Sequence, residues 1–554
     1  MLETARLWRD HDPDPDTRAR LTELIDAAAG GDPGAVADLG SRFQGPLTFG
    51  TAGLRGEVGA GESRMNVAVV TRATAGLARY LGDTVGHDAR VVVGCDARHG
   101  SDAFFDATTE VLAAQGFTVF ALPRRLPTPL TAYATRALDC DAGVMITASH
   151  NPPADNGYKV YLGGRATDES GRGVQIISPA DADIADRIAQ APAADEVPRD
   201  RDAVIDAGDD IVRDYILRTA GLRAGSGACP VRVVLTPLHG VGGTLAREVL
   251  RSAGIDDVHT VAAQFAPDPD FPTVAFPNPE EPGALDLALD LARDVRADVV
   301  IALDPDADRC SVATPAGDNG WRQLTGDEIG WLLGEQAAQD PTRDGDTLAC
   351  SVVSSRLLEK IAAHHDLRFA ATLTGFKWIA RTPGLRFGYE EAIGYCTDPQ
   401  SVRDKDGIGA MVRVIDLVES LARDGRTLTD ALDALARRHG LHATAPMSIR
   451  VEDTGRIASM MRRLRTAEIG DLAGSPVVEI VDLASGSGDL PPTDAMVVRT
   501  AADDRVIVRP SGTEPKLKCY LEVVLDCPDG AIPHDEAARR LEMLSTDVAA
   551  LLGV

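Results

Sequence analysis

The chain has 554 residues, of which 44% are hydrophobic, and its 56 Lys+Arg against 84 Asp+Glu give a formal net charge of −28. This is a globular composition, and the length predicts three or four domains. No apolar run approaches the roughly 18 residues of a membrane span, and we expect no secretory signal at the acidic start. Because so acidic a chain repels nucleic acid and anionic membranes, neither is expected as a partner. An anionic ligand would need a local basic site.

The eight cysteines do not form any C-x-x-C pair. Several lie in apolar, strand-like runs, such as Cys95 at the end of VVVGC. We therefore expect buried, reduced thiols rather than disulfides or zinc ligands. This cysteine usage predicts a cytoplasmic location.

Short apolar runs alternate along the chain with amphipathic helical stretches. Strands are predicted at 90–94 (RVVVG), 143–146 (GVMI), 231–235 (VRVVL), 298–303 (DVVIAL) and 506–508. Helices are predicted at 102–115 and 283–295, and residues 1–45 are expected to form a charged, helical lead-in. This alternation predicts α/β units with mostly parallel sheets.

Polar stretches rich in Ala, Pro and Asp interrupt this pattern. We interpret 191–201, 339–346 and the region around 439–448 as surface links. Domain boundaries are predicted near residues 210, 320 and 440.

The first chemically informative loop is 147–152 (TASHNP), directly after the predicted strand GVMI. Ser149 lies beside a potential base, His150, and Lys159 follows shortly downstream. One interpretation is a polar turn in which Ser149 or Asn151 caps a helix. The other is a serine that carries a phosphoryl group, with a metal and cations offsetting the added charge.

The second loop is 304–309 (DPDADR), after the apolar strand DVVIAL. Asp304, Asp306 and Asp308 alternate, so their carboxylates can converge on one cation, and oxygen ligands suit Mg²⁺. A solvated acidic turn is the alternative. An EF-hand loop does not fit, because Arg309 stands where that pattern needs glycine.

Two further loops carry charge and glycine. In 388–395 (GYEEAIGY), followed by 403–407 (RDKDG), paired carboxylates could accept hydrogen bonds from sugar hydroxyls, or could form an exposed charged turn. In 509–516 (RPSGTEPK), an arginine, hydroxyls, glycine amides and a lysine can form a phosphate nest, with an ordinary β-turn as the alternative.

Together and in this order, the four loops resemble those of the α-D-phosphohexomutase family of phosphoglucomutases, phosphomannomutases and phosphopentomutase relatives. Residues 49–56 (FGTAGLRG) are similar to the family's first active-site segment, and the resemblance runs from about residue 45 to 525. It implies four domains around a central cleft, of which three are related α/β domains and the fourth is a smaller α+β domain. These would be 1–210 with the phosphoserine loop, 211–320 with the metal loop, 321–440 with the sugar loop and 441–554 with a phosphate-binding loop.

The resemblance also implies roles for individual residues. Ser149 would be the phosphoserine and would ligate Mg²⁺ together with Asp304, Asp306 and Asp308. Sugar recognition would fall to Glu390, Thr374 and Gly375. The phosphate that does not react would be held by Arg509, Ser511, Gly512 and Thr513. The reacting centre would be lined by Arg55, His150, Lys159, Arg309 and Lys405, and Thr51 would bind the substrate.

One position departs from the family's common pattern. Many members have Ser two residues after the sugar-binding Glu, whereas this chain has Ala392. The variant looks like the subfamily that includes phosphopentomutase and glucose-1,6-bisphosphate synthase, and it puts strict hexose specificity in doubt.

The activity implied is interconversion of hexose 1-phosphate and 6-phosphate, with glucose or mannose as the sugar. It would run through a 1,6-bisphosphate intermediate, with glucose 1,6-bisphosphate as activator. His150 or Lys159 could be the base, and a monomer or dimer is expected. The alternatives are a phosphopentomutase and, further off, a sugar phosphatase or an inert sugar-phosphate-binding homologue.

Overall fold

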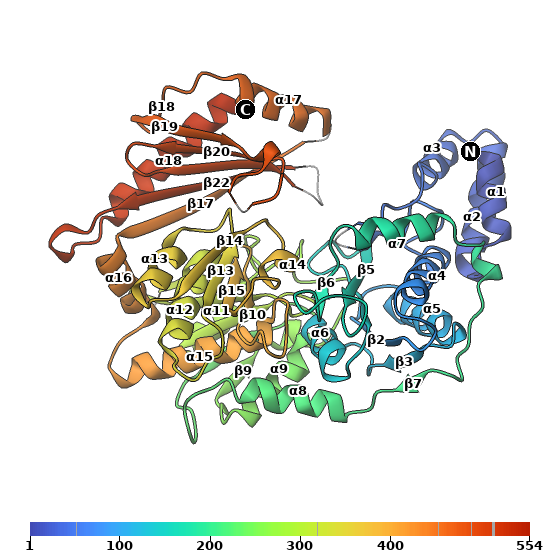
Figure 1. Cartoon of the computed structure of the whole chain (residues 1–554), viewed down its shortest axis with the longest axis horizontal. Helices are drawn as coiled ribbons and strands as arrows, with labels where there is room; N and C mark the ends of the chain where they lie inside the picture. Colours follow the sequence, from blue (N-terminus) through green and yellow to red (C-terminus); the bar gives the residue numbers. More distant parts are fainter. Residues whose placement is uncertain (51–52, 318–319, 452–453, 489, 512–515) are drawn as a thin grey trace. The chain divides into compact units, whose positions relative to one another are not determined.

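The structure is a computed structural model that describes the chain except for residues 51–52, 318–319, 452–453, 489 and 512–515. The chain divides into two units (Figure 1). The first contains Met1–Leu324 and Gly394–Ser420, and the second contains Thr325–Ile393 and Leu421–Val554. The chain therefore returns to the first unit before it completes the second.

Three helices open the first unit: α1 (Leu2–Asp10), α2 (Pro15–Ala29) and α3 (Pro33–Arg42). The side chains of Asp14 and Asp32 accept backbone N–H groups at the starts of α2 and α3, where proline occupies an early helical position. The helices bury a cluster of their own that includes Ala5, Leu21, Ile25 and Leu39. The helical lead-in predicted for residues 1–45 is confirmed.

The first sheet has the strand order β1-β5-β4-β2-β3-β7, with β6 paired to β5. Its strands are β1 (Leu54–Glu57), β2 (Arg90–Cys95), β3 (Thr118–Ala121), β4 (Ala142–Ile146), β5 (Asp155–Leu162), β6 (Val174–Gln175) and β7 (Ile205–Asp206). Its helices are α4 (Val67–Thr84), α5 (Ser101–Ala114), α6 (Thr128–Ala137) and α7 (Ala180–Ala189). Strands β2 and β4 are parallel, with Cys95 opposite Ile146, so the loops that follow both leave the same edge of the sheet.

The second sheet has the order β12-β11-β10-β8-β9, in which β8, β9 and β10 are parallel. Its strands are β8 (Val233–Thr236), β9 (Val258–Thr260), β10 (Val299–Leu303), β11 (Cys310–Ala316) and β12 (Gly320–Gln323). Nearby helices are α8 (Asp210–Ala220), α9 (Gly242–Ser252), α10 (Ala262–Phe265) and α11 (Asp286–Val295). Apart from this sheet, the returning segment Gly394–Ser420 contains β16 (Gly394–Cys396) and most of α15 (Gly407–Arg423).

The second unit holds a parallel group β14-β13-β15 and an antiparallel sheet of order β17-β22-β21-β20-β19-β18. The parallel strands are β13 (Thr347–Ser351), β14 (Arg368–Thr372) and β15 (Leu385–Glu390), with helices α12 (Gly326–Gln339), α13 (Leu357–His364), α14 (Phe376–Ile379) and α16 (Leu428–His439). The antiparallel strands are β17 (Leu441–Arg450), β18 (Asp471–Leu472), β19 (Ser475–Asp482), β20 (Met496–Thr500), β21 (Arg505–Pro510) and β22 (Lys516–Leu525). Helices α17 (Thr454–Thr466) and α18 (His534–Leu552) supply Met461, Leu464, Leu544 and Val548 to the core over this sheet.

The predicted fold class is confirmed: parallel α/β sheets come first, and an antiparallel sheet with helices completes the chain. The predicted strands and helices appear with ends shifted by a few residues. All eight cysteines lie within the described residues; each is free, and all are buried except the half-buried Cys527.

The interpretation of 439–448 as a surface link is wrong, because β17 (Leu441–Arg450) occupies it and pairs along its whole length with β22. The sequence of this segment does contain the alternation that is typical of a strand. Leu441, Ala443, Ala445, Met447 and Ile449 alternate with polar or proline positions, which is the period of a strand with one covered face.

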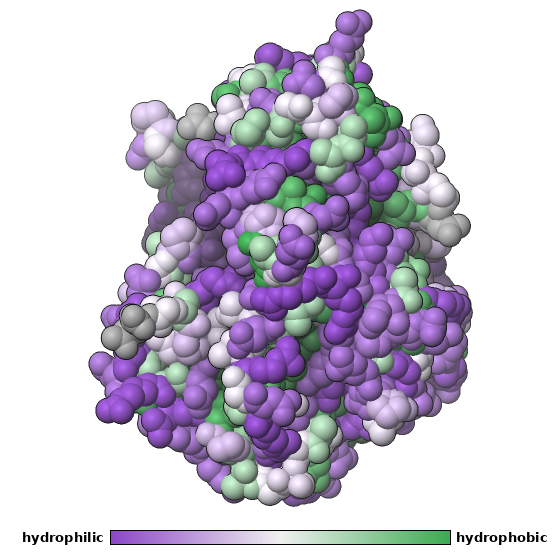
Figure 2. Space-filling view, turned by 90° about the vertical axis from the view of Figure 1, so that its left-hand side faces the viewer, coloured by the Kyte–Doolittle hydropathy of each residue, from purple (hydrophilic) through white to green (hydrophobic). Residues whose placement is uncertain are grey.

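The face drawn in Figure 2 is largely hydrophilic, with hydrophobic side chains in small, separate groups. Strongly exposed apolar residues such as Leu7, Leu217 and Val478 belong to different elements. Among the described residues, no helix is both long and apolar enough to span a bilayer.

A buried carboxylate on β22 joins the two sheets of the second unit. Glu522 is 1% exposed. It accepts hydrogen bonds from Ser355 Oγ at 2.7 Å and from the Arg356 Nε at 2.7 Å, just before α13. On the antiparallel side it lies 3.1 Å from both the Arg505 Nε and the His442 Nδ1. Burial would raise the pKa of Glu522, but Arg505, His442 and Arg356 hold it well below its usual value.

We predict that Glu522→Gln lowers the free energy of unfolding of the second unit by about 3 to 5 kcal/mol, because it leaves buried cations without their counter-charge. The matched control is Glu479→Gln. The exposed Glu479 Oε2 lies 3.4 Å from the Arg499 Nε, and this change should lower the free energy of unfolding by less than about 1 kcal/mol. Chemical denaturation of both variants measures the difference. Equal effects would show that Glu522 does not hold the two sheets together.

Candidate functional site

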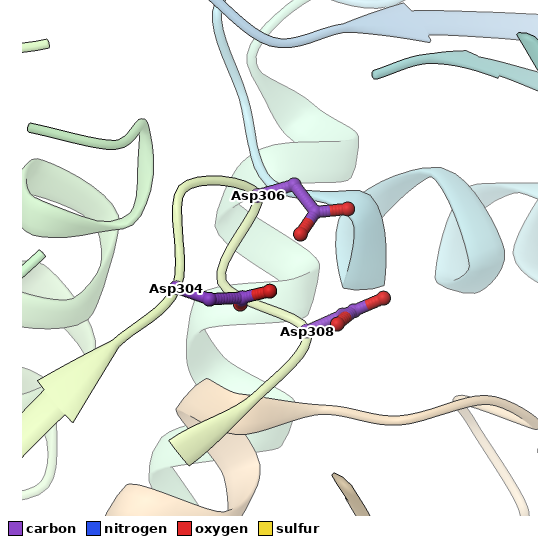
Figure 3. A group of neighbouring side chains, drawn as sticks. All are labelled: Asp304, Asp306 and Asp308. Atoms are coloured by element: carbon purple, nitrogen blue, oxygen red, sulfur yellow. The ribbon is translucent and has the colours of Figure 1, made fainter. Parts of the chain in front are cut away.

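Three aspartates converge in the loop between β10 and β11 (Figure 3). Asp304, Asp306 and Asp308 are each fully buried, and one carboxylate oxygen from each lies within 4.8 Å of the others. The buried Ala307 has a φ of 52°, so the chain turns sharply enough to aim all three side chains to one side. Within the part of the chain that the structure describes, no other group of His, Cys, Asp or Glu side chains is similarly close.

Cations and a hydroxyl surround these carboxylates. The Lys159 Nζ lies 2.7 Å from Asp306 Oδ2 and 3.1 Å from Asp308 Oδ2, and the Lys405 Nζ lies 3.2 Å from Asp308 Oδ2. Thr128 Oγ1 donates to Asp306 Oδ2 at 2.7 Å. Because isolated buried charges are very costly, these contacts are what allow the aspartates to lie in the interior.

Two carboxylate oxygens nevertheless lack a hydrogen-bond donor. Among the described residues, Asp306 Oδ1 and Asp308 Oδ1 have no hydrogen-bond partner, and both atoms are buried. Burial, followed by repulsion from Asp306 and Asp308, raises the pKa of Asp304 well above its usual value. Burial also opposes ionisation of Asp306, but Lys159 outweighs it and lowers that pKa. Clustered carboxylates with unfilled acceptor positions fit a hard divalent cation, so this loop can bind a metal ion.

Ser149 lies beside this group, in the loop that follows β4. Its Oγ is 3.2 Å from Asp304 Oδ2 and 3.4 Å from the His150 Nδ1. The residue is 4% exposed and has a φ of 54°, in the left-handed region that few residues with a Cβ adopt. The serine predicted from TASHNP and the aspartates predicted from DPDADR therefore meet.

Two arginines complete this cluster of the first unit. The Arg55 Nη1 donates to Asn151 Oδ1 at 2.9 Å, and the Arg309 Nε lies 3.7 Å from Asp308 Oδ1. Burial lowers the pKa of Arg55, although the negative charge of Asp306 opposes the shift. The structure thus brings together the predicted residues Arg55, Ser149, His150, Lys159, Asp304, Asp306, Asp308, Arg309 and Lys405.

The paired glutamates lie in the second unit, where β15 ends, and they have different surroundings. Glu390 is 8% exposed. The Glu391 Oε2 accepts from Ser351 Oγ at 3.0 Å and from Ser354 Oγ at 3.3 Å. Two serines of its own unit therefore hold Glu391, a distinction that the sequence did not make.

The remaining predicted residues also belong to the second unit. Thr374 and Gly375 precede α14, and Gly375 has a φ of 106°. Arg509 lies near the end of β21, and the Ser511 N–H donates to the Lys516 carbonyl at 2.9 Å. Thr51, Gly512 and Thr513 lie outside the described residues.

Sequence reasoning missed several residues that build the site. Thr128 contacts Asp306 from the start of α6, and nothing in its surrounding sequence indicates this. Arg98 and Asp96 follow the buried strand β2 in the run GCDAR and are themselves buried. A charged pair directly after a buried strand is the same signal that identified the aspartate loop, so this pair could have been found.

Comparison with known proteins supports the same interpretation. The four domains of the phosphoglucomutase/phosphomannomutase family match residues 46–194, 215–317, 325–439 and 447–529, the first three as alpha/beta/alpha domains I to III and the last as the C-terminal domain. A Haemophilus influenzae protein named "Probable phosphomannomutase" is 44% identical over 83% of this chain and 93% of its own length. Mouse phosphopentomutase is 34% identical over 98% of this chain and 93% of its own length.

A solved structure has the same fold. The phosphoglucomutase/phosphomannomutase family protein of Burkholderia thailandensis aligns with a TM-score of 0.69 at 20% identity, over 91% of this chain and 97% of its own. Fold and matches together define a phosphosugar mutase, an enzyme that moves a phosphoryl group within a sugar. The chain belongs to the phosphoglucomutase/phosphomannomutase family, which confirms the resemblance drawn from its loops.

A buried carboxyl beside Tyr389 gives a pH-dependent prediction. Asp327 Oδ1 accepts from the Tyr389 hydroxyl and the Ser355 N–H, both at 2.8 Å, and burial raises its pKa from 3.8 to about 7. The folded protein keeps this proton longer than the unfolded chain does. Its contribution to stability is therefore fully present below about pH 4 and is lost as the pH rises to about 7.

We predict that Asp327→Asn removes this loss, because the amide oxygen can accept both hydrogen bonds and does not ionise. The free energy of unfolding of the variant, relative to that of wild type, should rise by up to about 4 kcal/mol between pH 4 and pH 8, at about 1.4 kcal/mol per pKa unit. Denaturant unfolding of both proteins at the two pH values measures the change. A difference that does not vary with pH would contradict a buried, protonated Asp327.

Proposed function

We propose that this mutase interconverts the 1-phosphate and 6-phosphate of a hexose, glucose or mannose, with Ser149 as the phosphoryl carrier. The observation that carries the proposal is a buried serine hydroxyl 3.2 Å from one of three converging aspartates. A phosphatase of the aspartate-nucleophile type would not need this serine. An inert binding protein would not need to bury three carboxylates beside it.

The proposed reaction has two matching halves. In the first, the bond between phosphorus and the Ser149 oxygen breaks, a bond to the free sugar hydroxyl forms, and the hydroxyl proton leaves. The sugar 1,6-bisphosphate then turns around, and its other phosphoryl group returns to Ser149. Phosphoryl transfer depends on in-line positioning and charge neutralisation, and Lys159, Lys405 and Arg309 supply positive charge close to the serine.

His150 and Lys159 are the candidates for the base that receives the hydroxyl proton, a role that a lysine can play only when it is uncharged. The His150 Nδ1 lies 3.4 Å from Ser149 Oγ. Lys159 is also close, but Asp306 and Asp308 outweigh the effect of burial and raise its pKa, so it acts as a cation in this arrangement. The proposal leaves both groups in the reacting centre, and pH–rate profiles of His150→Gln and Lys159→Met separate their roles.

Asp304, Asp306 and Asp308, together with the phosphate on Ser149, are the proposed ligands of Mg²⁺. The orphaned oxygens of Asp306 and Asp308 support this choice, as do carboxylate donors without thiol or imidazole. When bound, the ion would withdraw negative charge from the transferring phosphoryl group.

Substrate recognition is proposed for the loops of the second unit. Glu390, Thr374 and Gly375 would bind the sugar hydroxyls. Arg509 offers paired N–H donors to the phosphate that does not react, together with Ser511, Gly512 and Thr513. Thr51 and Arg55 would contact the substrate from the first unit. The proposed division is 1–210, 211–320, 321–440 and 441–554, with one of the four loops in each domain.

A phosphopentomutase is the second candidate. Mouse phosphopentomutase aligns over nearly the whole chain, and Ala392 replaces the serine of stricter hexose enzymes. Glucose 1,6-bisphosphate is the proposed activator in the hexose reaction. We further propose a cytoplasmic enzyme, monomeric or dimeric, that does not bind nucleic acid or membranes, in keeping with its free cysteines and acidic charge.

Ser149→Ala should lower turnover by about three orders of magnitude or more, because it removes the covalent carrier rather than a binding contact. The control is Ser63→Ala, whose hydroxyl donates to the Gly45 carbonyl away from the site and should be almost neutral. Intact-mass spectrometry after incubation with glucose 1,6-bisphosphate should find one phosphoryl group on wild type and none on Ser149→Ala. Near-normal turnover of this variant would rule out Ser149 as the carrier.

Sugar preference is tested with glucose, mannose and ribose 1-phosphates, each with and without glucose 1,6-bisphosphate. We expect the hexoses to turn over fastest, with measurable ribose phosphate activity. Ala392→Ser should lower the ribose-to-hexose ratio by about fivefold, the effect of one added hydrogen bond of about 1 kcal/mol. Ala371→Ser, at an exposed position of β14, is the control. An unchanged ratio in Ala392→Ser would show that this loop does not set sugar choice.

A further inference from the structure

We propose that Arg98 is a positioning residue that holds the nucleophile loop in its strained conformation. The inference rests on the proposed role of Ser149. Arg98 follows β2 and is 4% exposed. Its guanidinium donates hydrogen bonds to backbone carbonyls around Ser149.

The guanidinium binds four carbonyl oxygens of one loop. Its Nη2 donates to the Ser149 carbonyl at 2.6 Å and to the Asn151 carbonyl at 2.7 Å. Its Nη1 donates to the Pro152 carbonyl at 2.8 Å and to the Asp155 carbonyl at 3.1 Å. The four terminal N–H groups therefore match four acceptors that converge from the serine loop.

The arginine is itself fixed on its other sides. Its Nε lies 3.5 Å from Asp96 Oδ2, and its guanidinium carbon lies 5.1 Å from the centre of the Phe271 ring. Asp96 is held in turn, because its Oδ1 accepts from Ser101 Oγ at 2.6 Å and from the Arg98 N–H at 3.0 Å. The donor group is thus rigid before it meets the loop.

This arrangement holds Ser149 at both ends of its backbone. The Ser149 N–H donates to Thr147 Oγ1 at 2.9 Å, and the Ser149 carbonyl accepts from Arg98. Between these two contacts the residue has a φ of 54°, which a side chain with a Cβ disfavours. Such a conformation persists only when its surroundings fix it, and Arg98 is the group that fixes the carbonyl side. The consequence is that the Ser149 hydroxyl faces Asp304.

Lysine cannot replace this residue. Its three N–H groups share one nitrogen and cannot reach four carbonyls spread over 149–155, although the charge is kept. A loop that moves by about 1 Å would lose in-line geometry and with it about 100-fold in rate.

The test compares Arg98→Lys and Arg98→Met with matched changes at Arg223. Arg223 is also buried, pairs with Glu419 and donates to the Gly227 and Ala253 carbonyls at 2.7 Å. It lies before β8, at the opposite edge of the parallel sheet from the aspartate loop. The measurements are kcat, KM, thermal midpoint, the rate of Ser149 phosphorylation by glucose 1,6-bisphosphate, and hydrogen exchange of the peptide that contains 147–155.

We expect Arg98→Lys to lower kcat and the phosphorylation rate by about 100-fold, with KM changed less than about threefold. Hydrogen exchange should accelerate in the 147–155 peptide of both Arg98 variants. Arg223→Lys should leave kcat and that peptide unchanged even where it lowers the thermal midpoint. Added guanidinium should restore part of the turnover that Arg98→Ala loses.

The proposal is overturned if Arg98→Lys keeps its kcat within about threefold of wild type. It is equally overturned if the Arg223 variants lose as much kcat as the Arg98 variants do. It is also overturned if exchange in 147–155 does not change. These results differ from a failure of the proposed function, in which wild type would neither convert any phosphosugar nor take up a phosphoryl group. Hydrogen exchange tests the loop contact in either case.

Discussion

The burial of three carboxylates at the end of one strand is the constraint on which this site depends. Asp304, Asp306 and Asp308 are fully buried within a single turn of chain, so their mutual repulsion and loss of hydration must be offset locally. Lys159 and Lys405 do this from β5 and from the segment that returns through Gly394–Ser420. Sequence-distant parts of the first unit are thereby tied to one loop, and the same concentration of charge suits a metal ion and a phosphoryl group.

The serine beside these carboxylates is fixed by a different means. Ser149 follows a strand that is buried on both faces, where its backbone has little freedom to shift. Hydrogen bonds to its N–H and its carbonyl keep it in a left-handed conformation. The site therefore combines charges balanced through side chains with a serine positioned through its backbone. In the second unit, paired serines hold Glu391, and the buried Glu522 joins the parallel sheet of β13 to the antiparallel sheet of β21.

Much of this could be predicted from sequence, because the informative signals are local. A serine or a run of aspartates directly after an apolar strand identifies both loops, and strand–helix alternation predicts the α/β fold. The less visible parts depend on contacts across the chain. Thr128 reaches Asp306 over 178 residues, and Arg98 reaches the Ser149 carbonyl over 51. Glu390 and Glu391 are adjacent and chemically identical, and the serine contacts of Glu391 come from residues 351 and 354, which are distant in sequence. Strand β17 was missed for another reason: its alternation was present, but its small and polar residues were interpreted as a link.

The most direct test of the central claim is a titration of the purified protein with Mn²⁺ as a stand-in for Mg²⁺, with free ion followed by electron paramagnetic resonance. If the buried carboxylates form a metal site, wild type should bind one ion per chain, and Mg²⁺ should compete for it. Asp308→Asn should lose this binding, while Asp268→Asn, at an acidic position outside the triad, should retain it. Equal binding by wild type and Asp308→Asn, or no binding by wild type at millimolar ion, would contradict the account.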